Sequence, residues 1–488
     1  MRLRSTARNS IVSYNAMQKV FKSRLDEGRS HARLSDFSNS FTQHNFITAP
    51  KANYEGMLSK NKNSFFDTKM YTSSEAVNFN LMSSVYNSLN STLLDIPFLI
   101  SAKSDPESFA DEVYNVLRFP KSELLEYFDH IQNIYNHSAS IFLEKSLHKT
   151  KTWLSKETLL ALLKIRQYDL LKSMHRANVI RLGEPHLVQL FDRFATYNGS
   201  HPHKAPGILN VIPWLEHGFG TFFPKGGMEQ IPKSLYQLAK EMGVKFHFNS
   251  RVDEIIVKNK KAIGLMVGGK EIIANKVVSN MDVHYTYRKL MPEIKAPEKT
   301  LNQERSSSAL VFYWGIKKEF KSLGLHNILF SERYKEEFDS MFDGRDIIDD
   351  PTIYINISSK LEKSDAPEGC ENWFVMINAP HHENQDWNEI SKRTKKAVIK
   401  KLNRMLNADI EPLIEQEKIW TPEGIQEDTL SYQGALYGNA SNSQFSAFLR
   451  HPNFSSSIDN LFFCGGSVHP GGGIPLALLS GKITSEII

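Results

Sequence analysis

Glycine is scarce in the first part of this sequence. Of its 26 glycines, only Gly28 and Gly56 precede Gly183. A Rossmann-type dinucleotide-binding loop needs three closely spaced glycines, G-x-G-x-x-G, directly after a strand, so that the backbone can approach a pyrophosphate. No such loop can be drawn ahead of Gly183, which excludes the usual N-terminal nucleotide-binding half of a doubly wound domain from that part of the chain.

Cysteines and long apolar runs are also scarce. The two cysteines, Cys370 and Cys464, lie far apart, which excludes a disulfide scaffold, fits a reducing compartment and leaves no metal-type cysteine spacing. No stretch of about 18 apolar residues predicts a membrane-spanning helix. The formal net charge of +5 on 488 residues is too small to indicate nucleic acid as the main partner.

The N-terminal residues have an unusual composition. Residues 1–60 carry ten Lys or Arg against four Asp or Glu, with neither a strand nor a helix period. The first 25 residues contain no acidic residue. This composition fits an organelle transit peptide or a poorly ordered basic arm.

Apolar periodicity predicts the order of the elements. Residues 105–198 have apolar residues at helical spacing and should be mostly helical. A turn at Gly226 and Gly227 should open a helix that Gly243 ends, followed by an antiparallel meander of short strands. Strands are also expected at 308–316, 352–357 and 372–378, and a helix is expected at 389–406.

The C-terminal stretch HPGGGIPL, residues 469–476, has the most informative pattern. It follows the short apolar run from Leu461 to Cys464, which predicts a buried strand, and Pro475 fits the start of a closing helix. A strand, a glycine-rich turn and a helix N-terminus together suit an anion or a cofactor, because the helix end offers unsatisfied N–H groups and partial positive charge. The stretch is no nucleophile elbow, since His469 replaces the second glycine, and no phosphate loop.

Several motifs together resemble the bacterial phytoene desaturase family. They are LFFCGGSVHPGGGIPLALLSGK, FFPKGGM, VVSNMDV, TYRKLMP and ENWFVMINAP. FLEKSLHK and RFATYNGSHPHKAPGILNVIPWLEH are most similar to its carotenoid 3,4-desaturase branch. The resemblance covers residues 99–488 and implies an FAD-dependent, amine-oxidase-like flavoprotein that acts on long polyenes.

The resemblance implies an α/β fold in two parts. One is a glutathione-reductase-like FAD-binding domain, discontinuous and with its N-terminal Rossmann half missing or divergent. The other is a mixed helical and β-sheet substrate domain. The implied ranges are a divergent segment at 1–98, the helical, membrane-facing part of the substrate domain at 99–215, a middle FAD-binding segment at 216–292, the substrate sheet at 293–440 and a C-terminal FAD-binding segment at 441–488.

The missing glycine motif leaves three explanations open. The reading frame is shifted upstream of about residue 99, or the half-site was replaced and the chain is an inactive or ligand-holding relative, or an unusual N-terminal domain binds FAD by other means. The composition of residues 1–98 and the abrupt start of family-like sequence at SAKSDPESFADEV favour a shifted frame.

The resemblance also implies which residues contact the cofactor. The set that would pack against the isoalloxazine ring is Gly465, Gly466, Gly471, Gly472, Gly473 and Ile474. The alternative is a loop whose glycines serve only close helix–strand packing. Arg251 and Val252 would lie beside the adenine, and the alternative for them is a plain meander strand. The residues near the flavin and the substrate tunnel would be Lys225, Gly226 and Gly227.

Catalytic and metal-binding residues are harder to assign. Glu216 and His217 are candidates for an acid or a base only by their position before the FFPKGGM motif. No metal site is predicted, because the pairs His201/His203 and His381/His382 have no third ligand at a familiar spacing. Candidates to line a polyene tunnel are Tyr313, Trp314, Phe445 and Phe448, although aromatic residues in strands more often belong to the core.

The predicted function is FAD-dependent desaturation of a carotenoid, either phytoene or a 1-hydroxylated acyclic carotene at C3–C4. Flavin N5 would accept the hydride, and the last helix would stabilise the resulting negative charge. The alternatives are a flavin-dependent carotenoid isomerase and a non-catalytic carotenoid-binding relative.

A carotenoid dissolves only in lipid, so a peripheral position at the inner face of the cytoplasmic membrane is expected. The basic residues of the helical region that would support it are Lys145, Lys149, Lys151, Arg166, Lys172 and Arg176, with an ordinary solvated surface as the alternative. The oligomeric state is left open.

Overall fold

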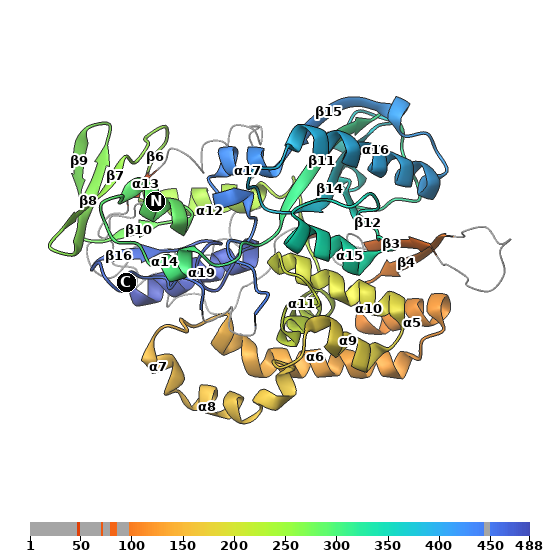
Figure 1. Ribbon diagram of the computed structural model, residues 1–488, viewed down its shortest axis with the longest axis horizontal. Coiled ribbons are helices and arrows are strands. Elements are labelled where there is room, and N and C mark those ends of the chain that lie inside the picture. Colours follow the sequence, from red (N-terminus) through yellow and green to blue (C-terminus); the bar gives the residue numbers. More distant parts are fainter. Residues whose placement is uncertain (1–45, 49–69, 72–78, 85–96, 444–448) are drawn as a thin grey trace.

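The computed structural model describes residues 46–48, 70–71, 79–84, 97–443 and 449–488 (Figure 1). Within these residues the largest β-sheet has seven strands. Its strand order is β15-β11-β14-β13-β12-β3-β4. The strands are β15 (Ile414–Trp420), β11 (Ser308–Ile316), β14 (Glu371–Ala379), β13 (Ile353–Asn356), β12 (His326–Leu329), β3 (Phe79–Ser84) and β4 (Pro97–Ala102). Neighbouring strands are antiparallel except β12 and β3, which are parallel.

Alternation along β14 shows why this sheet has a buried face. Every second residue from Glu371 to Ala379 is buried, and the residues between them are half-buried. The long helix α16 (Trp387–Leu406) covers that face, where Val398 and Leu402 belong to one core cluster with the tryptophans Trp314 and Trp373. The predicted strands at 308–316, 352–357 and 372–378 and the helix at 389–406 are confirmed within two residues.

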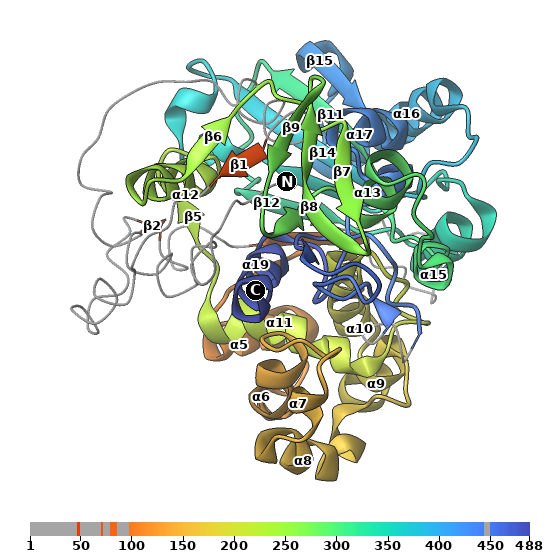
Figure 2. The same cartoon turned by 90° about the vertical axis from the view of Figure 1, so that its left-hand side faces the viewer.

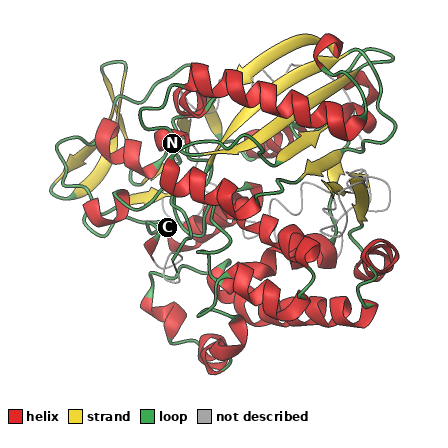
Figure 3. Ribbon diagram, turned by 45° about the vertical axis from the view of Figure 1, so that its right-hand side comes forward, coloured by secondary structure: helices red, strands yellow, loops and turns green. Residues whose placement is uncertain are grey.

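Helices form a block on the opposite side of the sheet from α16 (Figure 3). They are α5 (Pro106–Leu117), α6 (Lys121–Phe142), α7 (Thr150–Trp153), α8 (Lys156–Leu163), α9 (Met174–Leu182), α10 (Pro185–Asp192) and α11 (Val211–Phe219). Asp105 accepts a hydrogen bond from the Ser108 N–H at 2.8 Å and caps α5, whose first residue is Pro106. The predicted helical character of residues 105–198 is confirmed.

A separate meander leads to the C-terminal elements. The helix α12 (Gln230–Glu241) ends at Gly243, where φ is 79°, as the sequence predicts. The strands β7 (Glu254–Lys258), β8 (Lys261–Val267) and β9 (Lys270–Ile273) then form the antiparallel meander that faces the viewer in Figure 2. The other α-helices of the described residues are α13 (Val283–Leu290), α14 (Glu298–Leu301), α15 (Tyr334–Asp339), α17 (Pro422–Thr429) and α19 (Ile474–Ile487).

Two segments that are distant in sequence pair through a parallel ladder. The strand β10 (Val277–Ser279) lies beside β16 (Leu461–Phe463). Leu461 and Phe463 are buried while Phe462 is half-buried, so β16 buries one face more completely than the other. The pairing brings the middle and C-terminal parts of the chain into one core.

Among the described residues before Pro97, three strands join later parts of the chain. The strand β1 (Phe46–Thr48) pairs with β6 (Lys245–His247), β2 (Met70–Tyr71) pairs with β5 (Phe223–Pro224), and β3 pairs with β12. The rest of residues 1–96, as well as Phe445 and Phe448, lies outside the described residues, and so do the predictions made for them.

Candidate flavin and substrate site

The glycine-rich stretch forms the turn between β16 and α19. Gly473 directly precedes α19 with a φ of 89°, and Pro475 lies in the first turn. No side chain among the described residues caps this helix end. Ile474 is 51% exposed, so the first turn of α19 is open at the surface. Its N–H groups and partial positive charge are therefore accessible to a ligand.

Two other glycines lie close to the protein's own atoms. A Cβ on Gly472 would lie 2.7 Å from the Tyr437 Cα, a backbone atom, so close packing explains this glycine without a cofactor. A Cβ on Gly465 would lie 2.9 Å from the Asn280 Nδ2, the end of a flexible side chain, and the φ of 108° at Gly465 is what favours glycine there.

The other glycines of the loop differ in how much space an added Cβ would have. A Cβ on Gly466 would approach the Gly472 Cα to 3.2 Å, and one on Gly471, where φ is 145°, would approach the Arg450 guanidinium carbon to 3.3 Å. At Gly473 no atom of the described residues lies within 4 Å of the added carbon. Gly473 and Ile474 are thus the positions of the predicted set that have open space in front of them.

A buried polar pair fixes the shape of this loop. Asn453 and Ser480 are both completely buried. The Asn453 Nδ2 donates to the His469 carbonyl at 2.8 Å and to the Ser480 Oγ at 3.0 Å. The Ser480 hydroxyl in turn donates to the His469 carbonyl at 2.9 Å and accepts from the Gly465 N–H at 3.1 Å. These bonds satisfy loop groups that a buried turn would otherwise leave unpaired.

A cavity of about 1160 Å³ lies between the helical block and the large sheet. Its volume exceeds the usual range of about 300–1,000 Å³ for small-molecule pockets. The apolar side chains on its wall include Phe222, Phe223, Met228, Trp314, Phe374, Met376 and Leu436. Tyr437 also lines the cavity and packs on Gly472, so the glycine loop lies behind this part of the wall, and no residue from Gly465 to Ile474 is itself part of the lining.

The FFPKGGM residues contribute a second glycine pair to the cavity wall. Gly226 and Gly227 line the cavity with φ values of 82° and 87°. The Gly226 N–H donates to the Glu362 Oε1 at 2.7 Å. The neighbouring Lys225 is exposed. Tyr313 also lines the cavity.

The two residues predicted beside the adenine directly precede the meander, whose first strand, β7, begins at Glu254. Arg251 is exposed and Val252 is half-buried. Val252 packs against the core cluster that contains Val277 of β10 and Leu461 of β16. The structure thus places them near the parallel ladder, and their contact with a nucleotide stays a prediction.

The neighbours Glu216 and His217 point to different places. Glu216 lines the cavity, whereas His217 is 5% exposed and packs in the helical core, with its ring stacked on Phe109 at 5.0 Å between centroids. The His217 Nδ1 is 3.0 Å from the Lys103 carbonyl. Burial, with Arg193 nearby, lowers the pKa of His217 to about 3, so the ring is neutral at physiological pH.

Two residues that sequence reasoning missed surround Glu216. The Tyr197 hydroxyl donates to the Glu216 Oε1 at 2.6 Å, and an Arg193 Nη1–H donates to the Tyr197 hydroxyl at 3.2 Å. The Arg193 Nη2 lies 3.6 Å from the Glu216 Oε2. Burial raises the pKa of Glu216, and the charge of Arg193 with the Tyr197 bond opposes that rise.

A histidine and carboxylate cluster forms where the sequence showed only an H-x-H pair. His203 stacks on His175 at 3.8 Å between ring centroids, and the His175 Nδ1 lies 2.6 Å from the Asp192 Oδ2. Donor atoms of these three residues lie within 4.8 Å of one another. The other Asp192 oxygen accepts from the Asn178 amide at 2.9 Å, so hydrogen bonds already engage this carboxylate. Sequence spacing missed the group because α9 and α10 each supply one member.

The other histidines of the two predicted pairs contact side chains of the protein itself. His201 lies 3.0 Å from the Asp339 Oδ1, and His381 lies 3.0 Å from the Glu383 Oε1. His382 accepts a hydrogen bond from the Trp387 Nε1–H at 2.9 Å.

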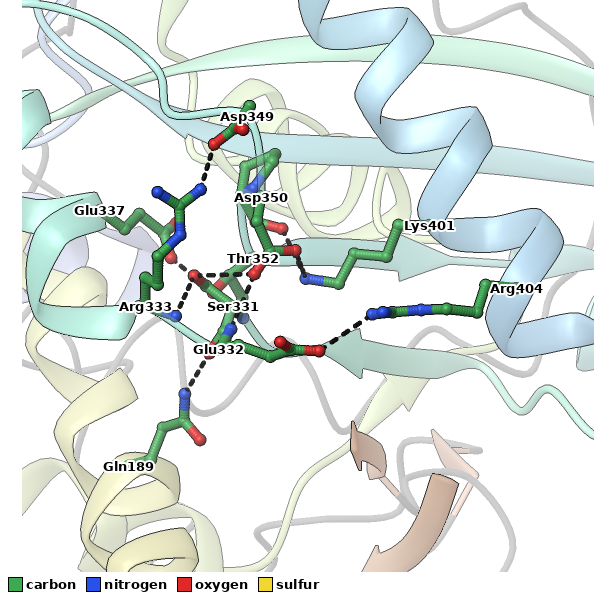
Figure 4. Close-up of polar contacts among 11 residues, drawn as sticks. Gln189, Ser331, Glu332, Arg333, Glu337, Asp349, Asp350, Thr352, Lys401 and Arg404 are labelled. Carbon is green, nitrogen blue, oxygen red and sulfur yellow. Dashed lines mark hydrogen bonds and ion pairs between the residues drawn. The ribbon is translucent and has the colours of Figure 1, made fainter. Parts of the chain in front are cut away.

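A polar network supports the cavity wall from behind (Figure 4). The Thr352 hydroxyl, on the wall, donates to the Glu337 Oε2 at 2.6 Å and accepts from the Ser331 N–H at 3.0 Å. Lys401 of α16 donates to the Asp350 Oδ1 at 2.8 Å. Burial raises the pKa of Glu337 to about 7, against smaller opposing effects of Thr352 and Lys401.

Comparison with known proteins relates this site to redox enzymes. Residues 13–488 match the family model described as flavin containing amine oxidoreductase. The chain is 51% identical, over 79% of its length and 79% of the relative, to a 1-hydroxycarotenoid 3,4-desaturase of Flavobacterium sp.. It is 32% identical to a 4,4'-diapolycopene oxygenase of Methylomonas sp. over 66% of this chain, a match that spans 65% of that oxygenase.

Solved structures with low sequence identity share the fold. An oxidoreductase from Methanosarcina mazei superposes with a TM-score of 0.52 at 13% identity, covering 86% of this chain and 83% of that one. A putrescine oxidase variant gives 0.51 at 12% identity, covering 86% and 82%. These matches confirm the predicted fold class.

Proposed function

Because this chain belongs to the flavin-containing amine oxidoreductase family, we propose that it is an FAD-dependent carotenoid desaturase. The reaction removes two hydrogens from a polyene, and the preferred substrate is a 1-hydroxylated acyclic carotene at C3–C4, with phytoene as the second candidate. The 51% identical relative carries the name of that reaction. The observation that supports it within this chain is the large apolar cavity whose wall residue Tyr437 packs on Gly472.

The predicted cofactor, FAD, agrees with the family description. The residues that would hold its ring are Gly473 and Ile474, where the structure leaves open space at an uncapped helix end. When bound, the flavin supplies an acceptor for a hydride. The first turn of α19 would contribute partial positive charge to the ring that Gly473 and Ile474 hold, and the apolar side chains of the cavity wall would help to exclude water and orient the polyene.

The division of the chain into domains is part of the proposal. Residues 216–292 and 441–488 would assemble the FAD-binding part, which the β10–β16 ladder supports. Residues 99–215 and 293–440 would form the substrate part, and both contribute to the cavity wall. Arg251 and Val252 would contact the adenine from just before the meander.

The lower helices in Figure 1 would rest on a lipid surface. Among the helices of the described residues, none is long and apolar enough to cross a bilayer. Leu154 and Leu171, near α7 and α9, are 86% and 85% exposed. Exposed basic residues lie in the same region, namely Lys149, Lys151, Lys172 and Arg176. Apolar side chains flanked by lysines are typical of peripheral contact with a membrane, which gives a lipid-soluble substrate a route to the cavity.

Product analysis tests the proposal. Purified protein reconstituted with FAD would be incubated with a 1-hydroxylated acyclic carotene in liposomes, and the products analysed by mass spectrometry. Desaturation removes two hydrogens, an isomerase leaves the mass unchanged, and a binding protein returns the carotene unaltered. The last two outcomes each overturn the proposal.

A further inference from the structure

Three polar side chains that contact one another stand on the cavity wall, whose other polar residues include His326, Asn356 and Asn372. Arg193 and Tyr197 belong to the 3-10 helix η2 (Arg193–Asn198), and Glu216 belongs to α11. The side chains of Arg193 and Glu216 are 8% and 14% exposed. Glu216 is the only acidic residue of α11, whose sequence VIPWLEHGF is otherwise almost entirely apolar.

Such a cluster is not needed merely to join the two helices. Desolvating an ion pair costs about as much as the attraction returns, and apolar side chains of similar size often stabilise a fold as well or better. The Arg193–Glu216 distance of 3.6 Å also makes this a loose pair. A largely buried cluster of mutually bonded polar side chains at a cavity wall is better explained by a polar group on the ligand.

The cluster lies at the glycine-loop end of the cavity. Asn198, next to Tyr197 in sequence, accepts a hydrogen bond from the Arg450 Nη2–H at 3.1 Å. Arg450 also donates to the Tyr437 carbonyl at 3.0 Å, and Tyr437 packs on Gly472. A short chain of contacts therefore connects the cluster to the loop before α19.

We propose that Arg193, Tyr197 and Glu216 bind the hydroxyl group of a 1-hydroxylated acyclic carotene. The substrate hydroxyl donates to the Glu216 carboxylate and accepts from Tyr197 or Arg193. This assignment rests on the proposed function. C1 bears the hydroxyl and is joined to C3 through C2, so a hydroxyl held at the cluster keeps C3–C4 next to the glycine loop, where the flavin would lie.

Specificity follows from the same contacts. A carotene without the hydroxyl offers the Glu216 carboxylate no donor in place of the water that the carotene displaces. Sites built to bind a substrate hydroxyl discriminate strongly against analogues that lack it. The cluster thus makes the cavity selective for hydroxylated ends, and its members act as binding and positioning residues.

Binding measurements with two carotenes test the site. Glu216→Gln and Tyr197→Phe would be compared with wild type for affinity, by tryptophan-fluorescence quenching, toward a 1-hydroxylated acyclic carotene and its non-hydroxylated counterpart. The expected result is a loss of about 10- to 100-fold for the hydroxylated ligand and less than about 3-fold for the other. Glu123→Gln, on an exposed turn of α6, is the matched control and should change neither.

Equal losses for both ligands, or no loss for either, overturn the site. If Glu216→Gln does not fold, as judged by its melting temperature, Tyr197→Phe decides the matter alone. kcat/KM for the two carotenes separates the two proposals. A wild-type protein that binds the hydroxylated carotene selectively but never desaturates it defeats the proposed function and leaves the site intact. A wild type that desaturates both carotenes equally well defeats the site alone.

Discussion

The loop from Gly465 to Gly473 and the cluster of Arg193, Tyr197 and Glu216 adjoin one cavity but are held in different ways. Carbonyl and hydroxyl contacts of buried neutral residues fix the loop, and its glycines leave little room for change. Charge and a tyrosine hydroxyl hold the cluster together, with a loose ion pair of 3.6 Å.

Because of this difference, substitutions in the loop and in the cluster should change different properties, namely the stability of the fold and the choice of ligand. A side chain added at Gly472 would clash with the Tyr437 backbone and should lower the stability of the fold. A substitution in the cluster removes groups that face the cavity and should chiefly change which ligand binds. Arg450 connects the two regions, since it bonds to Asn198 on the cluster side and lies against Gly471 on the loop side.

Arg450→Met should have the largest effect on stability. Arg450 is 2% exposed and donates to Asn198, to the Tyr437 carbonyl and to the Asn439 carbonyl, the last at 2.8 Å. Losing it leaves buried acceptors unpaired, so we expect the free energy of unfolding to fall by about 3–5 kcal/mol. Urea denaturation measures this. The control Arg404→Met removes an exposed pair with Glu332 and should cost less than about 1 kcal/mol. Equal effects of the two variants would contradict a joining role for Arg450.

Glu337→Gln should make the free energy of unfolding less dependent on pH. The folded pKa of Glu337 is raised from 4.5 to about 7, so the folded state favours the protonated form. Its contribution is complete below about pH 4.5 and is lost as pH rises through about 7, by up to about 3 kcal/mol. The nearby charges, Lys401 and Asp350, are retained in the variant. Unfolding at pH 5 and pH 8 should show the wild type losing more stability than Glu337→Gln; parallel pH profiles would refute the assignment.

The sequence predicted the loop region well because local residues determine it. The strand β16, the glycine turn and α19 follow from an apolar run, glycines with positive φ and a proline in the first turn. The meander and the end of α12 at Gly243 follow for the same reason. What the residues could not show is that Gly465 and Gly472 pack on Asn280 and Tyr437, which are remote in sequence.

The sequence predicted the cavity wall and its sheet less completely, because contacts between residues far apart in the sequence form them. The edge strand β15 has a mostly exposed, polar sequence, IEQEKIW, and so carries no apolar signal. Arg193 and Tyr197 were missed because they meet Glu216 only through the packing of η2 on α11. One signal was available, the single acidic residue in the apolar helix 211–219.

A pair of glycine substitutions sharpens the distinction within the loop. Gly472→Ala places a carbon 2.7 Å from the Tyr437 backbone, and we expect a loss of about 1–3 kcal/mol in the free energy of unfolding. Gly473→Ala meets no described atom within 4 Å, and its φ of 89° should cost about 1 kcal/mol. Relative to its loss of stability, Gly473→Ala should nevertheless lose more bound FAD than Gly472→Ala. Flavin absorbance after gel filtration measures the bound FAD. If both variants retain FAD in proportion to stability, the flavin does not contact Gly473.

The smallest effect concerns lipid contact, which lies away from both regions. Replacing Leu154 or Leu171 by Ser removes exposed apolar surface near lysines, so binding to anionic vesicles should weaken by about 1 kcal/mol, roughly five-fold, for each substitution. Flotation of phosphatidylglycerol vesicles measures this, and thermal stability should stay unchanged because neither side chain is buried. The matched control is Ile273→Ser on β9, which is 52% exposed and belongs to the meander. Equal weakening by the control would mean that exposed apolar surface anywhere on the chain binds lipid, and that the helices around α7 and α8 do not form a defined contact.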